Sequence, residues 1–318
     1  MINRSGGPEV LELEERPTPE PGAGQLLVDA GAAGVNYRDV YEREGAHGPP
    51  PPLIAGIEGA GKVAAVGDGV SGFSAGDRVG WITTPGSYAE QVLVDAGRAI
   101  PTPDGISDEL AAAALLQGIT AHYLVTSTYP VQAGDSVLVH AAAGGVGLLL
   151  VQMVKRLGGR VIGTTSTEEK AALVRAAGAD EVVGYEGFGE RARAFSGGGG
   201  VAVVYDGVGQ ATFVESLAAI RRRGTMVVFG ASSGQVVGVA AAQLMFGGSV
   251  YLTSPSIMDY TATRDELLWR AEEVYGQISG GKLDVRIGGR YPLGDARRAH
   301  EDLQARRSTG KLVILTRS

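Results

Sequence analysis

The fold of this chain can be read from one run of residues, Ser136-Val137-Leu138-Val139-His140-Ala141-Ala142-Ala143-Gly144-Gly145-Val146-Gly147. It begins with a short, almost continuously apolar segment, which is typical of a parallel strand buried on both faces. Glycines follow directly and open a helix that we expect over residues 144–157. Glycine lets the backbone approach a pyrophosphate closely, and the free N–H groups of a helix start bind its charge. The run predicts a dinucleotide-binding turn, although its spacing is Ala-x-x-Gly-x-x-Gly and a plain tight turn would also use glycine.

The same alternation of strand and helix continues after this run. Short apolar segments predict further strands at 160–164, 181–183, 201–206, 224–229 and 249–253. Helices are expected at 168–177 and 212–220. Strands that alternate with helices through short connections predict a doubly wound parallel sheet, the Rossmann arrangement of the α/β class.

The segments on either side have a different character. Short apolar runs broken by Gly, Pro and Asp predict a β-rich segment before residue 107, and a helix capped by Ser107 follows. The C-terminal end offers helices at 264–279 and 297–307 and a closing strand at 311–316. Because neither flank alone offers a complete core, we expect them to pack together. The expected domains are 1–116 and 258–318, forming one β-rich unit, and 117–257, inserted between them.

The composition excludes several kinds of chemistry. The 318 residues contain no cysteine and four histidines, none of them close together in sequence. This rules out disulfides, thiolate catalysis, iron–sulfur clusters and cysteine-ligated zinc. The formal net charge of -7 has the wrong sign for a general nucleic-acid binder. No apolar stretch is long enough to cross a bilayer and no signal core begins the chain, so we expect a cytoplasmic location without a membrane partner.

The residues after the second strand of the sheet indicate which dinucleotide binds. An Asp or Glu at this position usually holds the ribose hydroxyls of NAD, but here the strand runs into 163–167 without an acid. Ser166 and Lys170 suit a 2′-phosphate, and we therefore expect NADPH. Glu168 and Glu169 argue for NAD, but both also fit the first turn of a helix, where the macrodipole favours acids.

Other candidate side chains follow strands or lie at the expected domain junction. Thr120 either marks a hinge or places a hydroxyl near the cofactor. The loop 229–234 follows the fifth strand, at the edge where such sheets bind ligands. Tyr185 either covers an adenine or is simply a half-exposed aromatic ring. His140 and His300 are expected to be structural.

In the first segment, residues 34–41 gather polar and aromatic side chains. Within this segment, Arg38 and Asp39 are expected to form a surface pair of little energetic weight.

Together these strings resemble the quinone oxidoreductase branch of the zinc-free medium-chain dehydrogenase/reductase superfamily. The matching pieces are 6–11, 34–39, 75–79, 141–147, 204–209, 229–234 and 299–301. The resemblance implies a GroES-like catalytic domain split by a Rossmann domain. Zinc-dependent relatives carry a Gly-His-Glu ligand motif where this chain has Gly56-Ile57-Glu58. Since the ligand His is replaced, no catalytic zinc is expected.

The resemblance further implies an NADPH:quinone oxidoreductase with a small-molecule quinone substrate. The nicotinamide supplies the hydride, so the protein positions the reactants and stabilises charge. Tyr41 and Asn36 are the expected catalytic residues, donating hydrogen bonds to the acceptor oxygen or fixing the nicotinamide. The implied cofactor contacts are Asn36, Tyr41, Thr120, Gly144, Gly145, Val146, Ser166, Lys170, Tyr185, Phe229, Ser232 and Thr253.

Three positions depart from the pattern of the closest relatives. Ser254 stands where these often have Arg, Gln117 stands where some have Lys, and Gly184 precedes Tyr185 where Asn is frequent. The first two changes remove positive charge expected near the substrate. They leave the cofactor assignment as it is.

Two other functions stay open from the sequence. One is NADPH-dependent reduction of the carbon–carbon double bond of enals, enones or enoyl thioesters on the same scaffold. The other is a non-catalytic NADPH-binding protein with a structural or RNA-binding role, which the net charge and the lack of a basic–aromatic cluster disfavour. In either enzyme a homodimer is expected, with the strand at 249–253 as a sheet edge that pairs across a two-fold axis.

Overall fold

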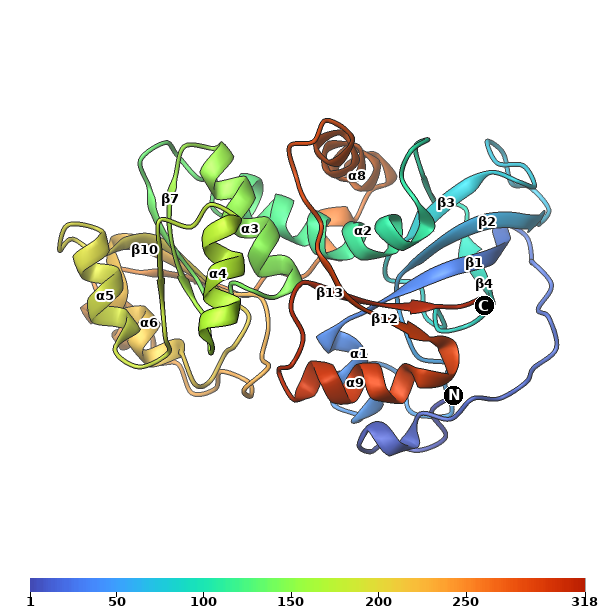
Figure 1. The fold of residues 1–318 in the computed structure, drawn as a ribbon, viewed down its shortest axis with the longest axis horizontal. Helices are drawn as coiled ribbons and strands as arrows, with labels where there is room; N and C mark the ends of the chain where they lie inside the picture. Colours follow the sequence, from blue (N-terminus) through green and yellow to red (C-terminus); the bar gives the residue numbers. More distant parts are fainter. Residues whose placement is uncertain (318) are drawn as a thin grey trace. The chain divides into compact units, whose positions relative to one another are not determined.

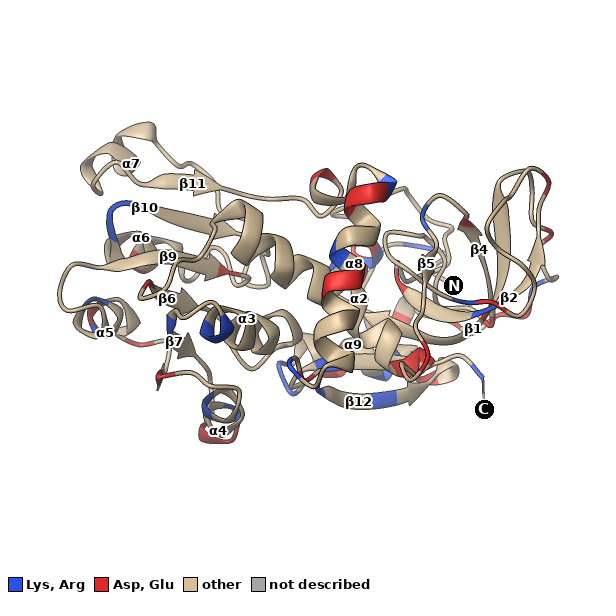
Figure 2. Cartoon of the chain, turned by 90° about the horizontal axis from the view of Figure 1, so that it is seen from above, with Lys and Arg blue, Asp and Glu red and all other residues tan. Residues whose placement is uncertain are grey.

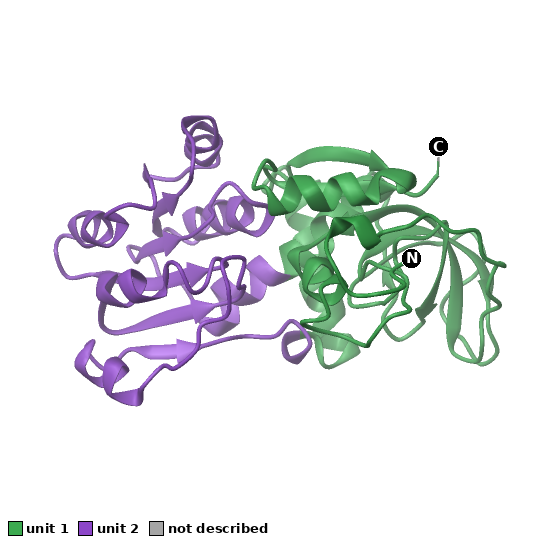
Figure 3. Ribbon diagram, turned by 90° about the horizontal axis from the view of Figure 1, so that it is seen from below, with its two compact units in different colours: residues 1–119, 261–318 green, residues 120–260 purple. Residues whose placement is uncertain are grey.

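The computed structural model describes residues 1–317 and divides the chain into two compact units (Figures 1 and 3). Unit 1 combines Met1–Ile119 with the segment that begins at Thr261, and unit 2 is Thr120–Tyr260. Both boundaries lie three residues beyond those expected from the sequence, 119 against 116 and 260 against 257. The first falls inside the helix α2, Asp108–Tyr123.

Unit 2 is built on a parallel sheet of six strands in the order β11-β10-β9-β6-β7-β8. The strands are β6 (Ser136–Val139), β7 (Arg160–Thr164), β8 (Glu181–Val183), β9 (Val201–Asp206), β10 (Ile220–Val228) and β11 (Tyr251–Thr253). The predicted doubly wound sheet is confirmed, with all six expected strands present. Every residue of the central strand β9 is buried, as its continuous apolar run requires. Except at the start of β10, the strands carry few charges (Figure 2).

Five helices complete unit 2 after the short turn η2 (Leu124–Thr128) that continues α2. They are α3 (Gly145–Arg156), α4 (Glu168–Ala176), α5 (Phe188–Phe195), α6 (Phe213–Ala219) and α7 (Ala241–Phe246). The aromatic rings of α5 pack with Leu138, Ile162 and Met226 in one buried cluster. Helix α7, by contrast, buries none of its residues.

Unit 1 contains a seven-stranded sheet in the order β12-β13-β1-β2-β3-β5, with β4 paired to β1. Its strands are β1 (Gln25–Val35), β2 (Gly59–Val66), β3 (Arg78–Trp81), β4 (Gln91–Asp95), β5 (Ile100–Pro101), β12 (Ile287–Pro292) and β13 (Lys311–Leu315). The C-terminal strand β13 pairs antiparallel with β1, placing Leu312 opposite Val35. The expectation that the two flanks build one core is confirmed.

The helices of unit 1 lie around this sheet. They are η1 (Pro8–Val10), α1 (Tyr37–Arg43), the N-terminal part of α2, α8 (Arg264–Ser279), η4 (Leu293–Asp295) and α9 (Ala296–Gln304), while η3 (Asp259–Thr261) spans the boundary between the units. The segment Asp108–Thr128, which contains α2, is long and apolar enough to span a membrane, but 72% of its window is buried inside the protein. That burial is what a core helix requires.

Candidate functional site

The turn between β6 and α3 has the geometry of a phosphate cradle. Ala141 adopts a positive φ of 48°, and the N–H of Ala142 donates to the carbonyl of Thr164 at 3.0 Å, tying the turn to the end of β7. A Cβ on Gly147 would lie 2.5 Å from the Ala141 carbonyl oxygen, so this position has no room for a side chain. Gly144 caps α3, whose first N–H groups have no acceptor within the helix. They present partial positive charge to an anion.

The loop after β7, residues 165–167, carries three hydroxyl groups and no acid. Thr167 caps α4, and its Oγ1 accepts a hydrogen bond from the N–H of Lys170 at 3.3 Å. Glu168 turns toward Arg175 of the same helix, with 2.5 Å between Oε1 and Nη1. This hydrogen bond lowers the pKa of Glu168. Glu168 is therefore engaged in an ion pair within α4, whereas Ser166 is exposed at the end of β7.

A buried histidine lies next to Tyr185, one of the predicted contacts. His140 is 1% exposed, and its two ring nitrogens hydrogen-bond to Thr164 Oγ1 at 2.9 Å and to Ser216 Oγ at 2.8 Å. Burial lowers its pKa to about 4, so the ring is neutral at pH 7. Tyr185 stacks over this ring with 6.3 Å between centroids. The two hydrogen bonds and the burial give this histidine a structural role.

The ends of β9, β10 and β11 carry the remaining predicted contacts of the sheet. The Asp206 carboxylate is fully buried and accepts hydrogen bonds from the N–H groups of Val208 and Gly209 and from the Thr212 hydroxyl, which fixes the loop after β9. Phe229 covers that loop, because a Cβ on Gly207 would lie 3.0 Å from its ring.

The carboxyl edge of the sheet thus gathers most of the predicted contacts. They are Gly144, Gly145, Val146, Ser166, Lys170, Tyr185, Phe229, Ser232 and Thr253. Thr120 belongs to the same unit but lies within α2, where it is 7% exposed.

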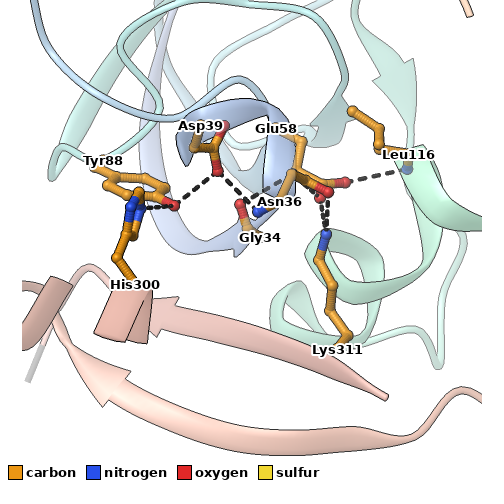
Figure 4. A network of polar contacts seen from close by, with 8 residues as sticks. All are labelled: Gly34, Asn36, Asp39, Glu58, Tyr88, Leu116, His300 and Lys311. Carbon is orange, nitrogen blue, oxygen red and sulfur yellow. Dashed lines mark hydrogen bonds and ion pairs between the residues drawn. The ribbon is translucent and has the colours of Figure 1, made fainter. Parts of the chain in front are cut away.

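Asn36 and Tyr41 belong to unit 1, where Asn36 is the N-cap of α1. The side chain of Asn36 is held from three directions (Figure 4). Its Nδ2 donates to Glu58 Oε1 at 2.7 Å and to the Gly34 carbonyl at 3.3 Å, and its Oδ1 accepts from Lys311 Nζ at 2.8 Å. Both amide hydrogens are therefore engaged, and one lone pair of Oδ1 remains.

A buried ion pair between Lys311 and Glu58 holds the side chain of Asn36, because each of them hydrogen-bonds to it. Both side chains are 0% exposed, and Nζ of Lys311 contacts Oε1 of Glu58. The second carboxylate oxygen of Glu58 accepts the N–H of Leu116 at 3.1 Å. Sequence analysis identified neither charge as part of the site. Lys311 comes from the last strand and Glu58 from the segment before β2. The pairing of both β13 and β2 with β1 brings them together.

Asp39 is the point where the structure overturns an expectation. It is 1% exposed and its Oδ2 accepts hydrogen bonds at 2.8 Å from both the Asn36 N–H and the Tyr88 hydroxyl, so it is not half of a surface pair. Arg38 pairs with Glu42 instead. Burial raises the pKa of Asp39 to about 7. The Asn-x-x-Asp spacing of a capping box was the available signal in the sequence.

The network continues from Tyr88 to the C-terminal flank. The Tyr88 hydroxyl lies 3.2 Å from Nε2 of His300, whose Nδ1 lies 3.2 Å from Nη1 of the buried Arg43. Burial, reinforced by Arg43, lowers the pKa of His300 to about 3. A neutral His300 accepts from one neighbour and donates to the other, so this histidine is structural, as expected.

Tyr41 lies on α1, half-buried, with its ring 5.5 Å from that of Tyr37. One short helix thus positions both predicted catalytic residues, Asn36 and Tyr41. At Gly56, a Cβ would lie 2.2 Å from the Tyr88 ring.

The donor set of the described residues does not suit a metal. Ile57 is buried at the position of the ligand histidine, and Glu58 is already paired with Lys311. Within residues 1–317, no group of three His, Cys, Asp or Glu side chains is placed to hold a metal ion.

A doubly wound unit with a glycine turn, inserted into a β-rich unit with a buried polar network, defines the class of two-domain dehydrogenases. Two family models match the chain, an alcohol dehydrogenase GroES-like domain over residues 22–104 and a zinc-binding dehydrogenase over residues 145–267. A quinone oxidoreductase of Pseudomonas aeruginosa is 43% identical over 98% of this chain and 97% of its own length. The chain belongs to the quinone oxidoreductase family of medium-chain dehydrogenases/reductases, as the resemblance implied.

Two further relatives bear on the chemistry. A mycobacterial protein whose structure was solved in complex with NADPH is 48% identical, with a TM-score of 0.97 over 99% of this chain and 98% of the other. A 2-haloacrylate reductase of a Burkholderia species is 36% identical over 99% of this chain and 98% of its own.

Proposed function

We propose that this protein is an NADPH:quinone oxidoreductase that works without a metal. The observation that carries the proposal is the carboxyl edge of unit 2, where the glycine turn fits a pyrophosphate, the loop after β7 offers hydroxyls, and Lys170 follows on α4 with Glu168 held by Arg175. The named relatives, one a quinone oxidoreductase and one solved with NADPH, support the same reading.

The residues of the chain position the reactants and stabilise charge. NADPH, when bound, supplies the hydride. Gly144, Gly145 and Val146 receive the pyrophosphate at the start of α3, and Lys170 and Ser166 receive the 2′-phosphate. Thr120, Tyr185, Phe229, Ser232 and Thr253 complete the proposed cofactor contacts.

In unit 1, the two proposed catalytic residues, Asn36 and Tyr41, have different roles. Both hydrogens of Asn36 Nδ2 are engaged, so only its Oδ1 can take part in binding, as an acceptor. In this role Asn36 would hold an N–H group, such as that of the nicotinamide carboxamide. Tyr41 is the proposed donor to the substrate oxygen that gains negative charge.

Lys170 tests the choice of cofactor. We expect Lys170→Ala to raise KM for NADPH at least tenfold and to leave KM for NADH nearly unchanged, because only NADPH carries the 2′-phosphate. Steady-state kinetics with both nucleotides and one benzoquinone measure this. The control is Lys155→Ala, which removes a lysine that pairs with Asp180 at the other end of the unit's strands. An unchanged preference in Lys170→Ala would contradict the phosphate site.

The second candidate is reduction of an activated carbon–carbon double bond, which the 2-haloacrylate reductase relative favours. Turnover of a benzoquinone and of a cyclic enone with NADPH, measured side by side, separates the two. Faster turnover of the enone would make double-bond reduction the preferred function over quinone reduction. NADPH binding without turnover of any acceptor would instead support the non-catalytic alternative.

We further propose a cytoplasmic homodimer. Strand β11 is the outer strand of the parallel sheet and pairs only with β10 among the described strands. Its first residue, Tyr251, is 64% exposed, which is unusual for a large aromatic side chain in a strand. A second copy paired along this edge would cover it.

A further inference from the structure

Helix α1, which positions both proposed catalytic residues, is anchored at its start by the buried carboxyl group of Asp39 (Figure 4). The Oδ2 atom of Asp39 accepts hydrogen bonds at 2.8 Å from the N–H of Asn36, the N-cap, and from the Tyr88 hydroxyl. Its Oδ1 is buried and has no hydrogen-bond partner within residues 1–317. One carboxyl oxygen therefore links the N-cap of α1, and through the helix Tyr41, to the segment before β4.

The hydrogen bonds behind Tyr88 all run toward this carboxyl group. The low pKa of His300, about 3, keeps its ring neutral at pH 7. The Arg43 guanidinium can only donate, so Nδ1 of His300 accepts from it and the ring proton sits on Nε2. Nε2 then donates to the Tyr88 oxygen at 3.2 Å, and the one hydroxyl hydrogen of Tyr88 goes to Asp39. The ring of Tyr88 is itself fixed against Gly56, where a Cβ would lie 2.2 Å from it.

The Asp39 carboxyl group changes its ionisation near neutral pH. Burial raises its pKa to about 7, against the two hydrogen bonds and the charge of Lys311, which favour the carboxylate. The titratable groups around Asp39 and its partner Tyr88 are Glu42 on α1, His300 on α9, Glu58 before β2 and Lys311 on β13. A proton on Oδ1 displaces neither hydrogen bond, but it turns Oδ2 into a carbonyl oxygen, which accepts more weakly than a carboxylate.

We propose that Asp39 is a positioning residue for the reaction: its carboxylate fixes the N-cap of α1, and thereby Asn36 and Tyr41, and its protonation weakens this hold. The inference rests on the proposed function, because Asn36 and Tyr41 are the residues that Asp39 places. Asp39 is 1% exposed, so it acts through its neighbours. Its part is distinct from that of Lys311 and Glu58, which hold the side chain of Asn36, because Asp39 holds the backbone.

Unit 2 contains a matched control in Asp135. Its Oδ2 accepts from the N–H three residues earlier, that of Gln132, at 3.0 Å, and from the Tyr129 hydroxyl at 2.9 Å. It is buried and precedes β6, at the opposite end of that strand from the glycine turn. Apart from an ion pair with Arg221, it repeats the arrangement around Asp39 without a link to the proposed catalytic residues. The same carboxyl-to-amide substitution can therefore be compared at both sites.

The test is the pH dependence of kcat between about pH 5.5 and 8.5, at saturating NADPH, with a benzoquinone and with a cyclic enone. We expect kcat of the native protein to fall at least fivefold as pH falls through about 7. Asp39→Asn, whose amide oxygen resembles the protonated carboxyl, should show at every pH the kcat of the native protein at the acid end. Asp135→Asn should follow the native profile. The Kd for NADPH, measured by fluorescence quenching, should change less than twofold in both variants, because the glycine turn lies in unit 2.

A second pair of variants changes the partner instead of the acid. Tyr88→Phe keeps the ring against Gly56 but removes one of the two hydrogen bonds that favour the charged carboxylate. The pKa of Asp39 should therefore rise, and the fall in kcat should move to higher pH. Tyr129→Phe removes the equivalent bond from Asp135 and should leave the profile where it is.

The outcomes separate this role from the proposed function. An active native protein whose kcat does not fall near pH 7, an Asp39→Asn variant that keeps the fall, or a Tyr88→Phe variant that does not move it would overturn the role of Asp39 alone. A native protein that binds NADPH and reduces neither acceptor would overturn the proposed function and this role with it. Thermal unfolding checks that each variant is folded. If Asp39→Asn does not fold, the native and Tyr88→Phe profiles decide.

Discussion

At the scale of single residues, the buried charges behind Asn36 are the least predictable part of the site. Lysine and glutamate are almost always exposed, so nothing in the runs around Glu58 and Lys311 marks them as interior. They are interior because strands distant in sequence pair and bring the two opposite charges together. Asn36 and Asp39 differ, since a local capping box places them and their spacing was readable.

The Lys311–Glu58 pair predicts strongly non-additive mutations. Lys311→Met leaves a buried carboxylate without its cation and should lower the free energy of unfolding by about 3–5 kcal/mol. The double variant Lys311→Met/Glu58→Gln removes both charges, and the single Gln oxygen still accepts one of the two hydrogen bonds that Asn36 and Leu116 donate to separate oxygens of Glu58. It should therefore be more stable than the single variant, which keeps an unpaired buried charge. Urea unfolding of the cycle measures both.

The control for this cycle is the exposed pair of Arg290 and Glu109, at 52% and 36% side-chain exposure. Arg290→Met should cost at most about 1 kcal/mol. A similar, small loss in Lys311→Met would show that the buried pair is not fixed in place. Since Lys311 also holds Asn36 Oδ1, the single variant should lower kcat in addition to stability.

His140 gives the protein a predictable sensitivity to acid. Its pKa is about 4 in the folded state and 6.5 ordinarily, so unfolding takes up a proton between these values and stability is lost as pH falls from 6.5 to about 4. The loss from this residue should reach up to about 3 kcal/mol. His300 acts in the same direction, whereas the raised pKa of Asp39 acts in the opposite one.

The variant His140→Gln separates the contribution of His140 to acid sensitivity from those of His300 and Asp39. His140→Gln cannot titrate, so its stability deficit relative to the native protein should shrink as pH falls through this window. Urea unfolding at each pH gives the difference. A deficit that stays constant from pH 6.5 to about 4 would mean that folding does not lower the pKa of His140.

At the scale of elements, the strands of unit 2 were predictable because each is a short apolar run between turn signals. Helices α5 and α7 were missed for physical reasons. α5 has a left-handed glycine and no side-chain cap at its start. α7 has only six residues, five of them apolar, and so shows no alternation of polar and apolar faces. β12, Ile287–Pro292, contains two glycines and a proline, and it is a strand only because β13 pairs with it.

The turn before α3 was predictable as a motif, and its geometry now predicts a specific defect. Gly147→Ala places a methyl group 2.5 Å from the Ala141 carbonyl oxygen and 2.7 Å from the Ala142 Cα, so the turn must open. NADPH binding, measured by quenching of protein fluorescence, should weaken at least tenfold.

Gly276→Ala in α8 is the matched substitution, because nothing lies within 4 Å of the added methyl and φ is not positive. It should raise the free energy of unfolding by about 0.5–1 kcal/mol without affecting NADPH. If Gly147→Ala binds NADPH as the native protein does, the pyrophosphate lies elsewhere.

At the scale of the whole molecule, the sequence predicted an inserted unit and flanks that close into one core, because each flank lacks apolar runs enough to stand alone. It could not predict the polar network, which depends on the register of β13 against β1. Nor does the fold of one chain explain why β11 ends its sheet with an open edge and an exposed Tyr251.

Pairing of that edge with a second copy supplies the explanation and the final prediction. Tyr251→Lys places a charge on the open strand, where natural edges use lysine to prevent pairing, and should convert a dimer to monomers in sedimentation velocity at micromolar concentration. Val214→Lys is the control, since Val214 is 73% exposed on α6, away from the edge, and should leave the dimer intact. A native protein that sediments as a monomer would contradict the proposed dimer. A Tyr251→Lys variant that still sediments as a dimer would show that the interface does not involve β11. Loss of the dimer should not abolish NADPH binding, because the glycine turn is complete within one chain.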